Sequence, residues 1–519
     1  MSRRILSFLC LFAAAAPLLR AQHTNHEADA EARATRAYSV AVKGGPLTLR
    51  AFLVQFPKGA DLHVHLSGAV YAETFLKDAA EDGMCVNTRT LSFAQPPCVA
   101  PLEPARQVNA GLTDAEQDLY DRLVDAFSMR SFVPTPEFSG HDQFFSTFDR
   151  FGGLSKRHRG EWVDEIARRA ADQNQQYLEL MSTPAFSHAK AIADQIGWTP
   201  DVAAMRRELL AHGLRDEVKP DLEAASVAET GRLRLENCGT PQAQPACGVT
   251  VRYLYQVLRG NPPQEVFAQA LLGFETVRAA MEAHDDTWVG VNFVMAEDGA
   301  ISMRDYTLQM RMVGFLHALY PKVHISLHAG ELAPGMVPPE GLRFHVRQAV
   351  ELAHAERIGH GVDVMYETNA NQLLREMAEK HVMVEINLTS NAGILGITGD
   401  RHPFPIYLAR HVPVALSTDD EGVSRIDLTH EYVRAALTYH LSYAQLKMLA
   451  RTGMEHSFLP GASLWAREDI FTEPAAACRG EALGGARPDS ACRALLAGSQ
   501  KAAAQWELER RFRAFEATF

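Results

Sequence analysis

The stretch Asp61-Leu62-His63-Val64-His65 decides the fold, because a short apolar run ends there in two alternating histidines. Residues two apart in a strand point to the same face, so His63 and His65 share one side of the predicted strand. The pair alone is weak, since 21 His among 519 residues give roughly one H-x-H by chance. Three later clusters strengthen it: His328-Ala329-Gly330-Glu331, Gly359-His360-Gly361 and Ser417-Thr418-Asp419-Asp420.

Eight apolar runs alternate with helical stretches, which predicts an α/β protein with a parallel sheet closed into a (β/α)8 TIM barrel. The runs cover residues 60–66, 176–181, 249–257, 288–295, 323–328, 357–360, 382–388 and 413–417. Active sites of such barrels lie at the carboxyl ends of the strands. Each of the four clusters falls at such an end.

The chain is longer than the about 250 residues of a bare barrel, so we expect additions around a barrel domain of residues 59–465. A lead-in, residues 22–58, carries a helical stretch near 27–42. An insertion of about residues 78–150, with Phe144, Phe145 and Phe148, is expected to overhang the active-site mouth as a lid. Residues 216–247 are interpreted as an external loop. In the tail, residues 466–519, positions 493–519 are typical of a closing amphipathic helix.

Residues 1–21 have the layout of a signal peptide: Arg3 and Arg4, an apolar run, and the small Ala21 at the expected cleavage point. The run is about 15 residues, short of the roughly 20 that span a bilayer, so an uncleaved anchor is the weaker alternative. We therefore expect an exported protein, periplasmic or secreted. The paired arginines leave a twin-arginine route open.

The composition, 47% hydrophobic and 22% charged, is that of an ordinary globular protein. Without the three arginines of residues 1–21, 48 basic and 63 acidic residues remain, a formal net charge of −15. No basic cluster is left to neutralise phosphates, which disfavours binding to nucleic acid or to an anionic membrane after removal of the signal.

Seven cysteines are present, and one of them, Cys10, lies in the signal segment. The other six form neighbouring couples: Cys85 with Cys98, Cys238 with Cys247, and Cys478 with Cys492. In an oxidising compartment, three local disulfides are the simplest interpretation. Six unpaired buried thiols are the alternative.

The clusters contain the groups of a mixed nitrogen and oxygen metal site. Imidazoles of His63, His65 and His328 with a carboxylate of Asp419 suit Zn²⁺ and, less selectively, other divalent first-row ions. Glu331, three residues beyond His328, can handle protons if its pKa is raised by burial; the plainer alternative is a helix-terminal charge. His360 lies between two glycines, and Asp420 follows Asp419; these two residues can hold a water molecule.

The motifs F-P-K-G-A-D-L-H-V-H-L-S-G, S-L-H-A-G-E, R-I-G-H-G-V-D and S-T-D-D resemble the adenosine deaminase family of the amidohydrolase superfamily, and M-E-H-S-F-L-P is similar to a late helix of that family. The resemblance implies one zinc ion per chain, held by His63, His65, His328 and Asp419. It further implies that Glu331 protonates the purine ring and that His360 and Asp420 position the attacking water. The absence of Lys from residues 288–295 disfavours a bridged two-metal centre.

Two departures from the family pattern concern the substrate. Ser67 stands where nucleoside-binding members usually carry an acidic residue that contacts ribose. The family's Ala-Gly pair in the fourth strand is replaced by Val294-Met295-Ala296-Glu297. Asn292 or Glu297 could face the substrate; a buried structural Asn and a solvated loop Glu are the alternatives.

The resemblance implies zinc-dependent hydrolytic deamination of a small-molecule purine, with adenosine or 2′-deoxyadenosine as the leading substrate. One rival is a barrel metal hydrolase acting on another amino-purine or amide. Another is a secreted, non-catalytic binding protein on the same fold. The retained metal and acid positions favour the enzyme.

Overall fold

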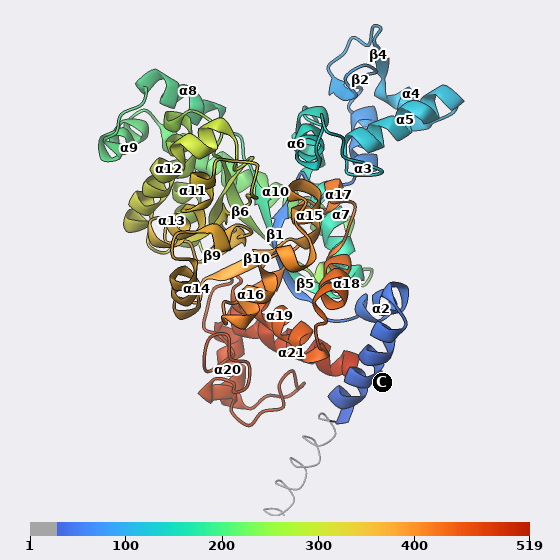
Figure 1. Cartoon of the computed structure of the whole chain (residues 1–519), viewed down its shortest axis with the longest axis vertical. Helices are drawn as coiled ribbons and strands as arrows, with labels where there is room; N and C mark the ends of the chain where they lie inside the picture. Colours follow the sequence, from blue (N-terminus) through green and yellow to red (C-terminus); the bar gives the residue numbers. More distant parts are fainter. Residues whose placement is uncertain (1–28) are drawn as a thin grey trace, which may run out of the picture.

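The computed structural model describes residues 29–519, and its centre is a sheet of eight parallel strands in the order β1-β5-β6-β7-β8-β9-β10-β11 (Figure 1). The strands are β1 (Gly59–His65), β5 (Gln175–Ser182), β6 (Thr250–Leu258), β7 (Trp288–Val294), β8 (His324–Ala329), β9 (Arg357–His360), β10 (Met383–Ile386) and β11 (Val414–Leu416). Beyond β11, Asp419 N donates to His63 O at 2.9 Å and His65 N donates to Asp419 O at 3.1 Å. These bonds join the last strand to the first, and the expected (β/α)8 barrel is confirmed.

Helices alternate with the strands and cover the barrel, because each strand is apolar and needs cover on its outer face. Those between β5 and β11 are α8 (Ser187–Ile196), α9 (Val202–Ala211), α10 (Val218–Leu235), α11 (Pro263–Glu282), α12 (Ala300–Leu319), α13 (His345–Glu351), α14 (Ala370–Glu379), α15 (Leu388–Leu395) and α16 (Phe404–Ala409). The others next to the barrel are α2 (Pro46–Leu53), α7 (Arg159–Asp172), α17 (Glu421–Ser424), α18 (Leu428–Tyr439) and α19 (Tyr443–Glu455). None of the helices in residues 29–519 is long and apolar enough to cross a membrane.

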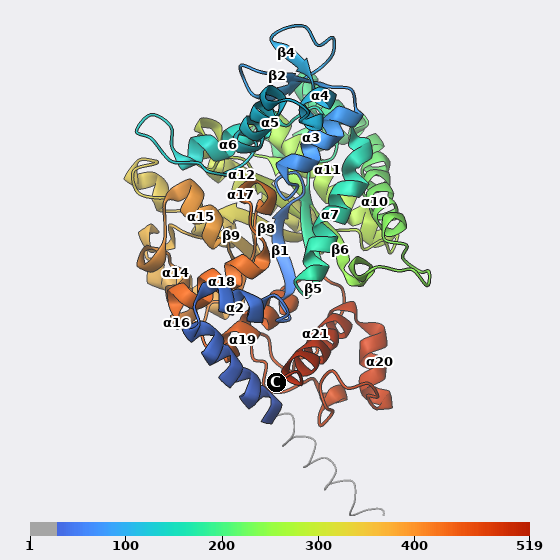
Figure 2. The same ribbon diagram turned by 90° about the vertical axis from the view of Figure 1, so that its right-hand side faces the viewer.

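An inserted unit stands between α3 (Ala72–Glu81) and α7, on the side of the barrel opposite the carboxyl-terminal helices (Figures 1 and 2). It contains a small antiparallel sheet in the order β3-β2-β4 and three helices. The elements are β2 (Cys85–Asn87), β3 (Ser92–Ala94), β4 (Leu102–Pro104), α4 (Ala105–Ala110), α5 (Asp114–Ala126) and α6 (Gly140–Arg150). Phe75, Phe127, Phe144 and Phe151 form part of a separate apolar cluster, which gives this unit its own core.

Two details of the additions differ from the sequence-based expectations. Residues 218–235, expected in an external loop, form the helix α10, where Ala225 and Ala228 are buried. The run is rich in Ala, Leu, Glu and Arg, which favour helix, and this outweighed its polar character. The prediction of a single closing helix over residues 493–519 is also wrong. The tail forms two helices, α20 (Ser490–Gly498) and α21 (Gln500–Glu516), which are separated at Ser499. The Ser499 side chain accepts from Ala502 N and so starts a new helix.

Three further expectations concern the amino-terminal helix, the signal segment and the disulfides. The helical stretch near residues 27–42 is present as a helix over residues 29–43. The predicted signal segment lies outside the described residues. All three predicted disulfides are formed: Cys85–Cys98, Cys238–Cys247 and Cys478–Cys492.

Candidate active site at the carboxyl ends of the strands

Four predicted ligand atoms converge at the carboxyl ends of the strands. His328 Nε2 lies 3.1 Å from His63 Nε2 and 3.2 Å from His65 Nε2. Asp419 Oδ1 lies 3.4 Å from His63 Nε2 and 3.2 Å from His65 Nε2. All four residues are buried. The sequence-predicted set therefore comes together from β1, β8 and the end of β11.

Each of the three imidazoles has a partner on its far side that fixes the ring. His63 Nδ1 faces Glu385 Oε2 at 2.6 Å, His65 Nδ1 faces Gln256 Oε1 at 3.1 Å, and His328 Nδ1 faces Asn292 Oδ1 at 2.7 Å. An oxygen acceptor at each Nδ1 favours the tautomer that carries its proton there, which leaves the Nε2 lone pair available to a metal ion. Three inward lone pairs beside a carboxylate repel one another unless a cation lies between them.

The donor set fits zinc. Zinc bonds to nitrogen and oxygen are about 2.0–2.2 Å, so tetrahedral ligands lie about 3.3–3.6 Å apart. The measured separations of 3.1–3.4 Å are close to that spacing. Three nitrogens with one oxygen are also the ligand types that zinc accepts.

His360 and Asp419 place their side chains with unusual backbone angles. Their φ values are +70° and +63°, in the left-handed region that non-glycine residues seldom adopt. His360 Nε2 lies 3.7 Å from Asp419 Oδ2, while its Nδ1 faces Asn391 Oδ1 at 2.8 Å. His360 thus stands beside the four-atom cluster, with its Nε2 directed toward it. Strain at these positions is typical of functional sites.

Glu331 is the acid next to the cluster. Its Oε1 lies 3.7 Å from His360 Nδ1, and the side chain is buried. Burial raises the pKa of Glu331 well above its ordinary range, and the negative charges of Asp419 and Glu297 raise it further. A carboxyl in such surroundings holds a proton near neutral pH and can donate it.

Glu297 positions Glu331 through the main chain. Its carboxylate accepts from Gly330 N at 2.9 Å and from Glu331 N at 2.8 Å, and it also pairs with His345. Burial raises the pKa of Glu297, but His345 and the backbone donors lower it to about 2. Of the two alternatives for this residue, the solvated loop Glu is wrong, because Glu297 is 2% exposed.

Asp420, the acid next to Asp419, has room for its side chain only because residue 68 is a glycine. A Cβ added at Gly68 would lie 1.5 Å from Asp420 Oδ1, so only glycine leaves room for this side chain. Burial raises the pKa of Asp420 well above its ordinary range, although His65 lowers it. Ser67, in contrast, is exposed and is not among the residues that line the cavity beside the cluster.

That cavity has a volume of about 400 Å³ and an apolar wall on the side of the insertion. The helix α6 supplies His141, Phe144, Phe145, Phe148 and Asp149. The barrel supplies His65, Gln256, Leu258, Val294, Met295, Ala296, His328, Glu331, Asp419 and Asp420. The aromatic residues expected to overhang the mouth therefore line the same cavity as residues of the candidate metal-binding cluster.

A model of the adenosine deaminase family matches residues 159–466, more than half of the 519 residues. The chain belongs to the adenosine deaminase family. The adenosine deaminase of Escherichia coli strain SMS-3-5 / SECEC is 35% identical to it over 137 residues, 26% of this chain and 38% of that protein. The similarity therefore spans less than half of the length of this curated relative.

Solved structures share the fold. An adenine deaminase from Arthrobacter aurescens has a TM-score of 0.50 at 16% identity, covering 78% of this chain and 94% of that one. An Arabidopsis ADAL complexed with IMP has a TM-score of 0.50 at 22% identity, covering 78% and 93%. An amidohydrolase from Burkholderia ambifaria with bound zinc has a TM-score of 0.51 at 18% identity, covering 79% and 88%.

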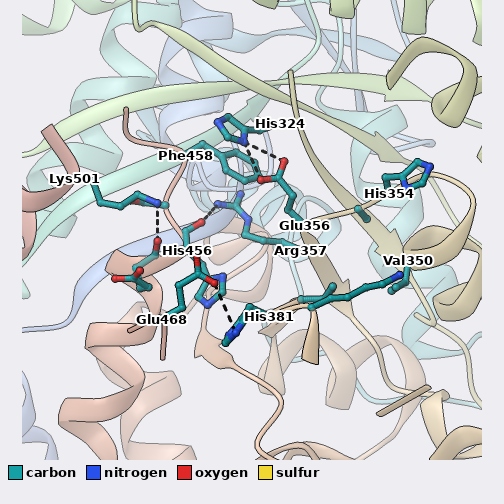
Figure 3. A pocket seen from close by; sticks show the side chains of 15 residues that line it. His324, Val350, His354, Glu356, Arg357, His381, His456, Phe458, Glu468 and Lys501 are labelled. Atoms are coloured by element: carbon teal, nitrogen blue, oxygen red, sulfur yellow. Dashed lines mark hydrogen bonds and ion pairs between the residues drawn. The ribbon is translucent and has the colours of Figure 1, made fainter. Parts of the chain in front are cut away.

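A second cavity, of about 370 Å³, lies at the amino-terminal ends of β8, β9 and β10 in this deaminase-family barrel (Figure 3). Several of its ionisable groups have partners: His324 pairs with Glu356, His381 and His456 pair with the neighbouring Asp469, and Lys501 donates to the main-chain carbonyl of Glu455. Residues at this end of a barrel generally serve stability. We therefore place the functional site at the opposite, carboxyl end.

Proposed function

We propose that this chain catalyses the zinc-dependent hydrolytic deamination of a purine nucleoside, with adenosine or 2′-deoxyadenosine as the leading substrate. The observation that carries the proposal is the buried Glu331, with its raised pKa, next to four convergent ligand atoms. A non-catalytic binding protein would have no need for a buried acid held by Glu297 at that place.

In the proposed reaction, water adds to C6 of the purine, the C6–N bond breaks and ammonia leaves. His63, His65, His328 and Asp419 would hold the zinc ion, which when bound would supply the Lewis acid that activates the water. Glu331 donates its proton to the ring nitrogen N1, which makes C6 electrophilic; the resulting carboxylate then takes the proton of the added hydroxyl and passes it to the leaving amine. His360 and Asp420 orient the water and accept its first proton, which returns to Glu331 once ammonia has left.

The cavity favours a nucleoside or a base over a nucleotide. Within the described chain, the residues that line it include no Lys or Arg, whereas several carboxyl side chains, among them Asp149, line the cavity. A phosphate group there would lack the cationic partners that usually bind it. Phe144, Phe145 and Phe148 offer an apolar wall for a purine ring.

A direct test incubates zinc-loaded protein with adenosine, 2′-deoxyadenosine, adenine and AMP and follows ultraviolet absorbance and ammonia release. We expect turnover of the nucleosides and little of AMP. Glu331→Gln should lower kcat by about 10²–10⁴-fold while zinc content stays unchanged. Glu351→Gln is the matched control, because Glu351 pairs with Arg347 on the surface. Full activity of Glu331→Gln would refute the proton-transfer role.

We further propose that residues 59–465 form the catalytic unit, with residues 22–58 and 466–519 as additions, and that the protein is exported. Three disulfides support export, because such bonds persist in oxidising compartments. Fractionation of producing cells, with amino-terminal sequencing of the mature protein, tests both the compartment and a start near Gln22.

A further inference from the structure

A second group of metal-ligand side chains lies at the base of the insertion, far along the chain from most of the barrel cluster. Asp78 comes from α3, His158 from the short 3-10 helix Lys156–His158, and Glu161 from the first turn of α7. One ligand atom from each lies within 4.8 Å of the others. The insertion leaves the barrel after α3 and returns just before α7, so the group joins its two ends.

Two of these side chains are buried and have an atom without a hydrogen-bond partner. Asp78 is 0% exposed and His158 is 1% exposed. Asp78 Oδ1 and His158 Nδ1 lie 3.5 Å apart, and neither forms a hydrogen bond. Buried polar atoms are nearly always satisfied, so two such atoms facing each other indicate a missing partner between them.

The other ring nitrogen of His158 is fixed by a carboxylate. His158 Nε2 lies 3.1 Å from Asp82 Oδ1, and Asp82 is itself held by Ser155 N at 2.9 Å and Arg157 Nε at 3.0 Å. A proton on Nε2 leaves the Nδ1 lone pair directed at Asp78. A carboxylate behind a histidine is the usual support of a metal-ligating imidazole.

We infer that Asp78, His158 and Glu161 form a second site for a divalent first-row metal ion, separate from the barrel centre. The Nδ1 separations of 3.5 Å from Asp78 Oδ1 and 3.7 Å from Glu161 Oε2 suit ligands around one ion, since tetrahedral zinc ligands lie about 3.3–3.6 Å apart. One imidazole with two carboxylates is a ligand set that Zn²⁺ accepts, with water at the remaining position.

Access to this site is through Glu161. Its side chain is 40% exposed, and its Oε2 lies 3.3 Å from Lys77 Nζ. Lys77 is 55% exposed, so an entering ion displaces a solvated ammonium group and no buried partner. The second Asp78 oxygen already accepts from Trp162 Nε1 at 2.7 Å, which leaves Oδ1 for the ion.

The site would tie the insertion to the barrel. Asp78 and Asp82 belong to the outgoing segment, and His158 and Glu161 belong to the returning one. An ion that bonds to both segments stabilises the folded arrangement of the insertion, which carries α6 and the aromatic wall of the cavity. The family resemblance implies one ion per chain, so an ion at this structural position would be the second.

The test is a metal count on the full chain, stripped with a chelator and titrated with Zn²⁺ alone. After gel filtration removes unbound metal, we expect elemental mass spectrometry to count two zinc ions per chain. The His65→Ala variant should keep one ion, at the base of the insertion, and His158→Gln should keep one, in the barrel. This arrangement makes failure of the second site distinguishable from failure of the proposed deaminase site.

Two further variants cover the case in which His158→Gln fails to fold. Glu161→Gln changes a partly exposed residue, and Asp82→Asn should weaken the second ion by about 10–100-fold. His324→Gln is the matched control, because His324 also pairs with a carboxylate, Glu356, but at the other end of the barrel. A parent chain that binds a single zinc, or equal zinc binding by the parent, His158→Gln and Glu161→Gln, would overturn the inference.

Discussion

Glu385 Oε2 lies 2.6 Å from His63 Nδ1, and both side chains are 0% exposed. The other carboxylate oxygen of Glu385 lies 2.7 Å from Arg357 Nε and accepts from Ser326 Oγ at 3.0 Å. Glu385 is thus held on both sides, and it fixes the ring of a proposed metal ligand. Its contribution to metal binding is indirect, through the orientation and basicity of His63.

Replacing Glu385 with Gln should therefore weaken the barrel zinc by about 10–100-fold. Arg357 keeps a partner in this variant, since its Nη2 lies 2.6 Å from Glu179 Oε2. Competition with a chelator of known affinity measures the effect. Glu356→Gln, which removes a surface carboxylate paired with His324, should bind zinc like the parent. Parent-like affinity in Glu385→Gln would show that His63 needs no such support.

A second prediction concerns Gly68, where a Cβ would lie 1.5 Å from Asp420 Oδ1. In Gly68→Ala, Asp420 must move by more than an ångström, and a displacement of that size can cost about 100-fold in rate. We expect kcat/KM with adenosine to fall by about that factor while the barrel zinc remains. The control is Gly498→Ala, because nothing lies within 4 Å of a Cβ added there. Equal losses in both variants would contradict the role of Gly68.

The strands and the inward-facing site residues were predictable because each strand combines an apolar run with a polar cluster at its end. Seven of the eight predicted runs differ from the observed strands by one or two residues at an end, and 357–360 agrees at both. The predicted ligand atoms of His63, His65, His328 and Asp419 converge because the barrel closes through main-chain bonds between Asp419 and β1.

The supporting residues were missed for a physical reason. Glu385, Gln256 and Asn391 lie in mostly buried segments, and their partners are more than 30 residues away in the chain. The role of Glu385 could have been recognised from the sequence, because a charged residue inside an apolar strand needs a buried partner. The helix α10 was missed for a different reason: the polar character of residues 218–235 suggested a loop, although the stretch is rich in good helix formers.

A third prediction concerns the contact that links α6 of the insertion to the barrel beside the cavity. His141 Nε2 lies 3.0 Å from Asp298 Oδ1. Burial lowers the pKa of His141, but Asp298 and Asp142 together raise it more, so the net shift is upward. The ion pair between His141 and Asp298 is thus fully formed below pH 6.5, the ordinary pKa of His, and it is lost as the pH rises through the raised pKa of His141.

Loss of this pair frees α6 to move. Because partly exposed ion pairs contribute about 0.2–1 kcal/mol, His141→Gln should raise the KM for adenosine by no more than about fivefold, with a smaller change in kcat. The difference between variant and parent should shrink at high pH, which a series of KM measurements checks. His212→Gln, on the exposed end of α9, is the control. A purely kcat effect would argue against a lid role for α6.

The last prediction concerns acid stability at Glu275, on the outer helix α11. Its carboxylate accepts from Arg215 Nη2 at 2.8 Å, Tyr320 Oη at 2.6 Å and Arg278 Nη2 at 2.7 Å. Burial raises the pKa of Glu275, but these donors outweigh it and lower the value from 4.5 to about 2. The carboxylate therefore stabilises the fold fully above pH 4.5, and this contribution is lost as the pH falls toward about 2.

Glu275→Gln should lower the free energy of unfolding at pH 7 by about 1.5–3 kcal/mol, the range of hydrogen bonds to a charged group, because the buried carboxylate is lost while Arg215 and Arg278, 52% and 35% exposed, stay partly hydrated. The difference from the parent should narrow as the pH falls from 4.5 toward 2. Urea unfolding at several pH values measures it. Glu282→Gln is the matched control, since Glu282 pairs with the same Arg278 but is 64% exposed, so its effect should stay below about 1 kcal/mol at every pH. A pH-independent difference in Glu275→Gln would show that shape, and not charge, determines the stability at this position.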